Sequence, residues 1–346
     1  MKRSKDLFFT SPRTEGLGIC LSGGGALGFA HIGVLQALED HEIYPQHIVG
    51  SSMGAIVGTF YAAGYSPAEM LQLIKDDKLY KITKLMTFHP TFLKSGLSDH
   101  HLLRQLVKEL IPHNSFGQLK RKLNLCVVNL NRAEWEIVST GDELDKWLAA
   151  SASIPGIFEA IKHNDSYYVD GGLLNNMPAQ GIEDNCQTII GVDVIPHIPP
   201  LHLNKTIDTL ASSVRAMQHQ NSREGRDLCR FLIEPRAIEK HHEFSFDAYN
   251  DIYLYGYRAA TKYIVENPEM MNGVEVFPNP GIDQITVRNT LNYDKVSIIN
   301  SEGKILLSQQ INENECQIGT SLLPKGIYFL NFSNQKQNET LKFIKN

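Results

Sequence analysis

The stretch HIVGSSMGAIVGTFYAAG, residues 47–64, most constrains the fold, because small residues join a short apolar run to a longer one. HIVGS predicts a buried strand, and MGAIVGTFYAAG predicts a helix that ends at Gly64. Gly50, Ser52 and Gly54 place the pattern G-x-S-x-G on the turn between them. A nucleophilic serine on such a turn needs small neighbours two positions away, because larger side chains would collide. Ser52 is therefore either a nucleophile or simply a small residue in a tight turn.

A second glycine cluster, SGGGALG at residues 22–28, follows the apolar run LGICLS and precedes a helical pattern. A dinucleotide-binding turn would fit the spacing, but the next strand ends without the acidic residue that holds the ribose. A P-loop would continue with Lys and Ser or Thr, whereas here Phe29 and Ala30 follow. The remaining functional interpretation is a set of glycine amides at a helix start, directed at a developing oxyanion. The Met53 amide, at the start of the next helix, would join them.

The order of these elements predicts an α/β fold. Strand, helix, strand, helix with short connections indicates parallel strands with helices on the faces of the sheet. Residues 66–121 look mostly helical, LNLCVVNL and EWEIVST predict a hairpin, TIIGVDVIP predicts a buried strand, and residues 205–264 look helical again. We expect a three-layer α/β/α domain with a mainly parallel sheet.

The pattern changes near residue 267, where short alternating runs separated by turn residues replace the longer periods. Strands at such spacing are typical of a small antiparallel β-sandwich. The sequence thus predicts four segments: an N-terminal extension (1–16), the α/β domain (17–266), a linker (267–273) and an all-β domain (274–346).

The amino-acid composition indicates which partners and which cellular compartment to expect. The formal net charge of −5 leaves no basic excess for neutralising nucleic-acid phosphates. The five scattered cysteines favour buried free thiols in a reducing compartment. The N-terminus has no apolar run long enough for a secretory signal, and no window approaches a membrane span. We therefore expect a protein that is cytoplasmic or peripheral to a membrane.

A nucleophilic serine needs a base, and VDGGLLNNMP offers Asp170 at the end of a strand. Gly171 and Gly172 let the chain turn sharply after it. A carboxylate in apolar surroundings could take the serine proton directly, because burial raises its pKa. A Ser-His-Asp triad with His197 is the competing hypothesis, but VIPHIPP predicts a strand that enters a rigid proline loop. His31 lies in the first helix and is expected to be packed rather than to act as the base.

Together these motifs resemble the patatin-like phospholipases, which are lipid acyl hydrolases with a Ser-Asp dyad. ASASIPGIF at residues 150–158 fits a further segment of that family, and the resemblance runs from about residue 17 to 264. It implies Ser52 as nucleophile, Asp170 as proton acceptor, no metal and no cofactor. It also implies an oxyanion hole and a set of motif glycines. The oxyanion-hole amides are those of Gly24, Gly25 and Met53; the motif glycines are Gly23, Gly28, Gly50, Gly54, Gly171 and Gly172.

The C-terminal segment resembles the type A sorting domain of type IX secretion, through VFPNP, LPKGIYFLNFSN and the terminal ETLKFIKN. Cargo of that system is exported, which conflicts with the absence of a signal peptide. The alternative is therefore a secreted or outer-membrane surface protein whose true start carries a signal. A generic β-sandwich appendage is the other interpretation of this segment.

These observations predict a serine hydrolase that cleaves acyl esters of phospholipids or lysophospholipids. A lipase must meet a membrane or micelle surface, and residues 75–96 interleave lysines with apolar residues in a way that suits transient binding there or a lid. A solvated helix face is the alternative for that stretch. Two other functions stay open: a short-chain carboxylesterase or thioesterase on the same dyad, and a catalytically silent protein that binds lipid or a partner.

Overall fold

The chain forms two compact units in the computed structural model, Thr14–Asn267 and Pro268–Asn346. The structure describes residues 16–76, 100–195, 206–267, 270, 275–279, 281, 283–288, 290, 293–313, 315–334 and 338–345. The N-terminal residues 1–15, His197 and most of the basic and apolar stretch, residues 77–96, lie outside the described residues.

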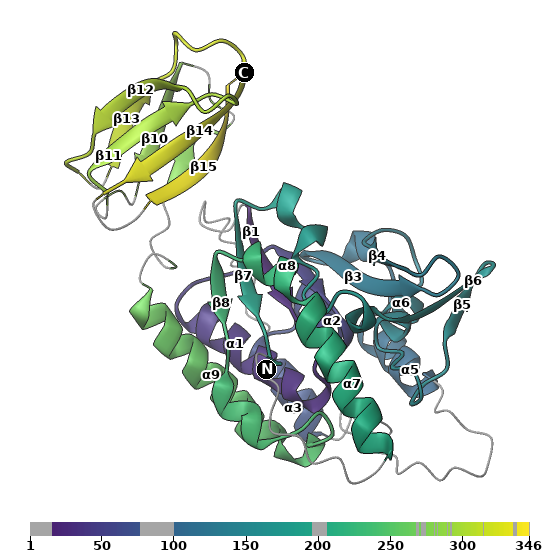
Figure 1. The fold of residues 1–346 in the computed structure, drawn as a ribbon. Helices are drawn as coiled ribbons and strands as arrows, with labels where there is room; N and C mark the ends of the chain where they lie inside the picture. The colour runs from purple at the N-terminus through teal and green to yellow at the C-terminus, as the bar shows by residue number, and fades with distance from the viewer. Residues whose placement is uncertain are drawn as a thin grey trace. The chain divides into compact units, whose positions relative to one another are not determined.

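An eight-stranded mixed sheet organises the N-terminal unit, in the order β5-β6-β3-β2-β1-β7-β8 with β4 paired to β3 (Figure 1). The run β3-β2-β1-β7-β8 is parallel, whereas β4, β5 and β6 pair antiparallel. The strands span β1 Leu17–Leu21, β2 His47–Gly50, β3 Lys122–Asn129, β4 Glu134–Val138, β5 Ile161–His163, β6 Ser166–Asp170, β7 Thr188–Val192 and β8 Phe231–Ile233.

Helices cover both faces of this sheet. The α-helices described are α1 Phe29–Asp40, α2 Ser52–Ala63, α3 Pro67–Lys75, α5 His101–Leu110, α6 Leu144–Ser151, α7 Thr206–Asn221, α8 Arg223–Asp227 and α9 Tyr249–Glu266. The order β1, β2, β3 proceeds in one direction across the sheet, so right-handed crossovers put α1 and α2 on the same face. The connection from β7 to β8 proceeds in the opposite direction and puts α8 on the other face. The expected three-layer α/β/α arrangement with a mainly parallel sheet is thus confirmed.

Each face of the sheet has its own apolar packing. Gly58 of α2 lies against Ile48, because a Cβ on that glycine would come within 2.9 Å of the Ile48 side chain. On the opposite face, Cys20 packs in a cluster with Met177 and Ile182. Apolar side chains on both faces are the reason that these short strands are nearly continuous hydrophobic runs.

Two strands of the sheet, β8 and β5, were not predicted from the sequence. Residues 205–264 were expected to be helical throughout, but β8 interrupts them and extends the sheet beside β7. The three-residue β5 was not expected at all and pairs with β6. Strands of three residues are too short to show a periodicity of two, so only their partners in the sheet reveal them. Among the described residues no helix is long and apolar enough to cross a membrane.

The C-terminal unit is antiparallel in all its named strand pairs, as expected. One sheet has the order β13-β10-β9 and the other β12-β11-β14-β15. Their strands are β9 Glu275–Phe277, β10 Gln284–Arg288, β11 Lys295–Ile299, β12 Ile305–Gln310, β13 Glu315–Gly319, β14 Gly326–Ser333 and β15 Asn338–Lys345. Buried residues of both sheets, among them Ile285, Leu330 and Phe343, form one apolar cluster. The alternation of buried and exposed residues along β14 reflects this packing.

Candidate active site

Ser52 lies on a sharp turn between β2 and α2 with its backbone in the left-handed region, at a φ of 52°. Few non-glycine residues adopt this conformation, and they concentrate at functional sites. A Cβ on Gly54 would come within 2.2 Å of the Leu21 carbonyl oxygen, and one on Gly50 within 2.6 Å of the Gly54 carbonyl carbon. The two glycines are therefore required by the close approach of backbone segments around Ser52.

The glycine loop, residues 23–28, lies beside this turn. A Cβ on Gly23 would come within 3.1 Å of the Ser52 Cβ, and one on Gly28 within 2.3 Å of the Met53 side chain. Gly25 adopts a φ of 55°, and the carbonyl oxygen of Glu243 lies 2.4 Å from the position of its missing Cβ. The loop thus runs in close contact with both the serine turn and the chain at Glu243, which leaves no room for side chains.

The amides of the glycine loop divide into two groups. Gly23 N–H donates to Asn176 Oδ1 at 3.1 Å, and Ala26 N–H donates to the Glu243 carbonyl at 2.8 Å. The amides of Gly24, Gly25 and Met53 have no hydrogen-bond partner among the described residues. These three are the ones that the sequence nominated for an oxyanion hole.

Asp170 ends β6 and is 3 % exposed. Its Oδ1 accepts a hydrogen bond from Gly172 N–H at 2.8 Å, while the buried Oδ2 accepts none of normal length and angle from the described residues. Burial raises the pKa of Asp170 from its ordinary value of 3.8 to about 6, against the opposing effects of the Ser52 hydroxyl and the Gly172 amide. The side chain is therefore a buried carboxylate beside Ser52, with one oxygen available to a proton.

Residues 151–153 form hydrogen bonds to the backbone of both Ser52 and Asp170. Ser151 Oγ accepts a hydrogen bond from Ser52 N–H at 3.3 Å and donates one to the Cys126 carbonyl at 2.7 Å. The Ser153 carbonyl accepts a hydrogen bond from Asp170 N–H at 3.0 Å. Ser151 and Ser153 belong to the motif ASASIPGIF, although the sequence alone did not indicate what either serine contacts.

The aspartate loop, residues 170–176, is tied to its surroundings by side-chain amides. Asn221 at the end of α7 donates from Nδ2 to the Gly172 and Leu173 carbonyls and accepts from Asn176 N–H. Gly172 lies under the same cluster, since a Cβ there would approach Asn176 Oδ1 to 2.7 Å. No sequence pattern pointed to Asn221, because its partners lie 45 to 49 positions away. The other motif glycine of this loop, Gly171, packs against β3, because a Cβ on it would lie 2.4 Å from the Cys126 carbonyl oxygen.

His31 is fully buried in α1 and serves the glycine loop rather than the serine. Its Nε2 lies 2.8 Å from the Ser22 carbonyl oxygen, to which it donates a hydrogen bond as a neutral ring. Burial lowers the pKa of His31 to about 4, so the ring is uncharged at neutral pH. This agrees with the expectation of a packed histidine.

Fold and site define the class of the N-terminal unit: an α/β domain with a left-handed serine turn, a glycine loop and a buried aspartate. Residues 19–182 match the patatin-like phospholipase family, and residues 275–346 match the secretion system C-terminal sorting domain. The N-terminal unit thus contains a patatin-like phospholipase domain at residues 19–182, and the C-terminal unit contains a type IX sorting domain at residues 275–346. That second domain points to secretion through the type IX system.

Several known proteins are similar to part of this chain. The chain is 31 % identical to lysophospholipase NTE1 of Candida glabrata over 203 residues. The matched region covers 56 % of this chain and 11 % of the relative. An uncharacterised NTE family protein of Mycobacterium bovis is 31 % identical over 169 residues, 49 % of this chain and 45 % of the relative. VipD from Legionella pneumophila is 14 % identical with a TM-score of 0.43, over 74 % of this chain and 67 % of that one. The chain thus spans about a tenth of the fungal lysophospholipases that it matches.

Proposed function

We propose that the N-terminal unit hydrolyses acyl esters of phospholipids or lysophospholipids, with Ser52 as nucleophile and Asp170 as its base. The observation that carries the proposal is the buried Asp170 carboxylate beside a serine on a left-handed turn; its Oδ2 accepts no hydrogen bond of normal length and angle from the described residues. A base needs a free lone pair directed toward the proton it accepts, and in unliganded enzymes that contact is often longer than a normal hydrogen bond.

The reaction follows from these positions. Ser52 Oγ attacks the ester carbonyl while its proton passes to Asp170 Oδ2, and the amides of Gly24, Gly25 and Met53 donate to the oxyanion that forms. The intermediate expels the alkoxide, which leaves as an alcohol with the proton from Asp170. The acyl group remains on Ser52. Water then attacks this acyl-enzyme, again losing a proton to Asp170, and releases the fatty acid and the free serine.

The substrate class is argued from the relatives. Relatives named lysophospholipases and the patatin-like family model both favour a phospholipid-derived ester over a short-chain one. Such substrates reside in membranes or micelles, so the protein would bind those surfaces transiently. The sorting domain favours action outside the cytoplasm, after export.

Hydrolysis of p-nitrophenyl esters of increasing chain length, and of lysophosphatidylcholine and phosphatidylcholine, tests this function. We expect turnover that rises with acyl length, release of fatty acid from the lipids, and covalent labelling of Ser52 by a fluorophosphonate. Preference for acetyl and butyryl esters with no action on lipid would favour the short-chain esterase. No turnover and no labelling would instead favour a binding protein.

The pH profile of kcat/KM should report the Asp170 carboxylate. Burial raises its pKa to about 6, and only the ionised carboxylate accepts the serine proton. Activity on a neutral ester is therefore expected to fall about tenfold per pH unit below that pKa and to level off above it. A histidine base would give a similar fall in activity at low pH. His197 is the competing base, so the profile is compared with that of His197→Gln, which should keep the same apparent pKa. Loss of most of the activity in His197→Gln, or a shift of the apparent pKa, would contradict the assignment.

A further inference from the structure

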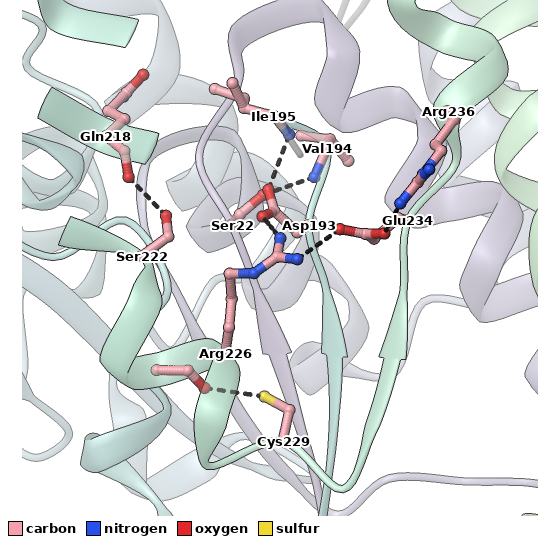
Figure 2. A network of polar contacts seen from close by, with 11 residues as sticks. Ser22, Asp193, Val194, Ile195, Gln218, Ser222, Arg226, Cys229, Glu234 and Arg236 are labelled. Carbon is pink, nitrogen blue, oxygen red and sulfur yellow. Dashed lines mark hydrogen bonds and ion pairs between the residues drawn. The ribbon is translucent and has the colours of Figure 1, made fainter. Parts of the chain in front are cut away.

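A partly buried ion-pair network lies at the carboxyl end of β7 (Figure 2). Asp193 directly follows the strand, and its side chain is 1 % exposed. Arg226 of α8 donates from Nη1 to Asp193 Oδ2 and from Nη2 to Glu234 Oε1. Glu234 also pairs with Arg236 at 2.9 Å, on the exposed side of the network. Arg226 is the cation that pairs with Asp193 among the described residues.

The second carboxylate oxygen of Asp193 shapes the chain after β7. Oδ1 accepts a hydrogen bond from Ile195 N–H at 2.8 Å, two residues further on. This is a local turn in which an aspartate side chain holds its own backbone. Asp193 N–H in turn donates to the Ile233 carbonyl at 3.1 Å. The positions of Val194 and Ile195 thus depend on the Asp193 carboxylate, which Arg226 holds from the other side.

Val194 and Ile195 lie directly against the glycine loop. Val194 Cγ2 is 2.5 Å from the place of a Cβ on Gly24, and Ile195 Cγ1 is 3.4 Å from it. Val194 N–H also donates to Ser22 Oγ at 3.0 Å, one residue before the loop begins. A displacement of these two residues would therefore move the backbone of Gly24.

Helix α8 reaches the loop by a second route, through the residue beside Arg226. Gly225 is packed so closely on Met177 that a Cβ would lie 1.6 Å from the Met177 carbonyl oxygen. Met177 follows Asn176, whose Oδ1 accepts the Gly23 amide. One short helix thus supports both Gly23 and Gly24.

We propose that Arg226 is a positioning residue which, through Asp193 and the pair Val194 and Ile195, holds the glycine loop with its Gly24 and Gly25 amides directed at the reacting carbonyl. The inference rests on the proposed function and adds residues to it that touch no substrate. Without Arg226 the buried Asp193 would lose its cation, and a buried charge left without its partner is strongly unfavourable. The turn at Asp193 would rearrange, and the loop would lose its support. Oxyanion donors act only within a narrow range of distances.

The test compares Arg226→Met, Arg226→Lys and Asp193→Asn with wild type in the full chain. Removal of one oxyanion donor costs roughly 10²–10³-fold in kcat, so we expect a misplaced loop in Arg226→Met to cost roughly 10–100-fold, with KM for a soluble p-nitrophenyl ester nearly unchanged. Arg226→Lys should restore part of the rate. Hydrogen exchange of the glycine-loop amides should become faster in Arg226→Met. Arg236→Ala is the matched control, because Arg236 is 62 % exposed and touches only the outer side of the network.

The readouts separate a positioning role from a purely structural one. A lower melting temperature with wild-type kcat and wild-type loop exchange in the folded variant would overturn the inference. If Arg226→Met does not fold, Asp193→Asn takes its place. Asparagine keeps the shape of the side chain and an oxygen that can accept from Ile195 N–H, while the charge is removed. Its kcat and the hydrogen exchange of its glycine-loop amides are then compared with wild type. A wild type that neither hydrolyses esters nor reacts with a fluorophosphonate would refute the proposed function, while loop exchange would still decide whether Arg226 holds the loop.

Discussion

Replacement of Ser52 by alanine is expected to reduce kcat by roughly 10³–10⁶-fold, because the acyl-enzyme cannot form without the nucleophile. The loss should appear on every ester that the wild type cleaves, since the same step is common to all of them. Fluorophosphonate labelling should disappear with the hydroxyl. Alanine at a φ of 52° keeps the same backbone strain as serine, so the melting temperature should change little. Initial rates, labelling and thermal unfolding of the same preparations check the three expectations.

Ser51→Ala is the matched control for this substitution. The neighbouring serine donates from Oγ to the Asn175 carbonyl at 2.8 Å and has an extended backbone. Its loss removes one buried hydrogen bond, which costs about 1 kcal/mol of stability. We expect Ser51→Ala to remain within about tenfold of wild-type kcat, since such a stability loss leaves the protein folded. Equal losses at both serines, or activity retained in Ser52→Ala, would refute the assignment of the nucleophile.

Replacement of Asp170 by asparagine is expected to lower kcat roughly 10²–10⁴-fold, the usual contribution of a general base. The protein should nevertheless become more stable at pH 8. The pKa of Asp170 is raised in the folded chain, so its ionisation opposes folding above about pH 6, and asparagine removes that charge. The gain should shrink as the pH falls through 6 and vanish below 3.8, where the aspartate is protonated in both states. Thermal unfolding across this range, beside the kinetics, tests both halves.

Asp145→Asn is the matched control, because Asp145 is as buried as Asp170 but its pKa is shifted in the opposite direction. Burial acts to raise the pKa of Asp145, but hydrogen bonds from Asn114 and Arg104 outweigh it and lower the pKa. Its charge therefore supports folding at neutral pH, and its loss should lower the melting temperature. We expect kcat of the folded variant to stay near that of wild type. A loss of stability in Asp170→Asn would contradict the raised pKa of Asp170, and retention of most of the activity would contradict its assignment as the base.

Much of the fold was accessible from local patterns. The strand-turn-helix units around Ser52 and after β1 were predicted because apolar runs of strand and helix length flank glycine-rich turns, and glycine tolerates the conformations that such tight turns require. The sandwich was predicted because alternating runs such as GIYFLNF bury every second residue. In contrast, β8 lies in a region of helical composition, and its three residues become a strand only because β7 offers a free edge. Local pattern reasoning fails where a partner elsewhere in the chain selects the structure.

The candidate site divides in the same way. Ser52, Asp170 and the glycines around them were nominated from the sequence, and their catalytic roles remain predictions. Asn221 and Arg226 were not nominated, because neither belongs to a motif. Each acts on a segment 33 or more positions away, and only the packed chain brings the two together.

The sequence by itself determined the tight strand-turn-helix unit at Ser52, because apolar runs of strand and helix length flank a turn with glycines at positions 50 and 54. Only the tertiary structure decided which polar groups of the site stay free. The Gly23 amide donates to Asn176, 153 positions away, and the Ala26 amide donates to the Glu243 carbonyl. The amides of Gly24 and Gly25 have no hydrogen-bond partner among the described residues. The physical reason is that turn residues and hydrophobic periodicity are local properties of the chain, whereas hydrogen-bond partners, close contacts between distant segments and burial depend on the whole folded chain.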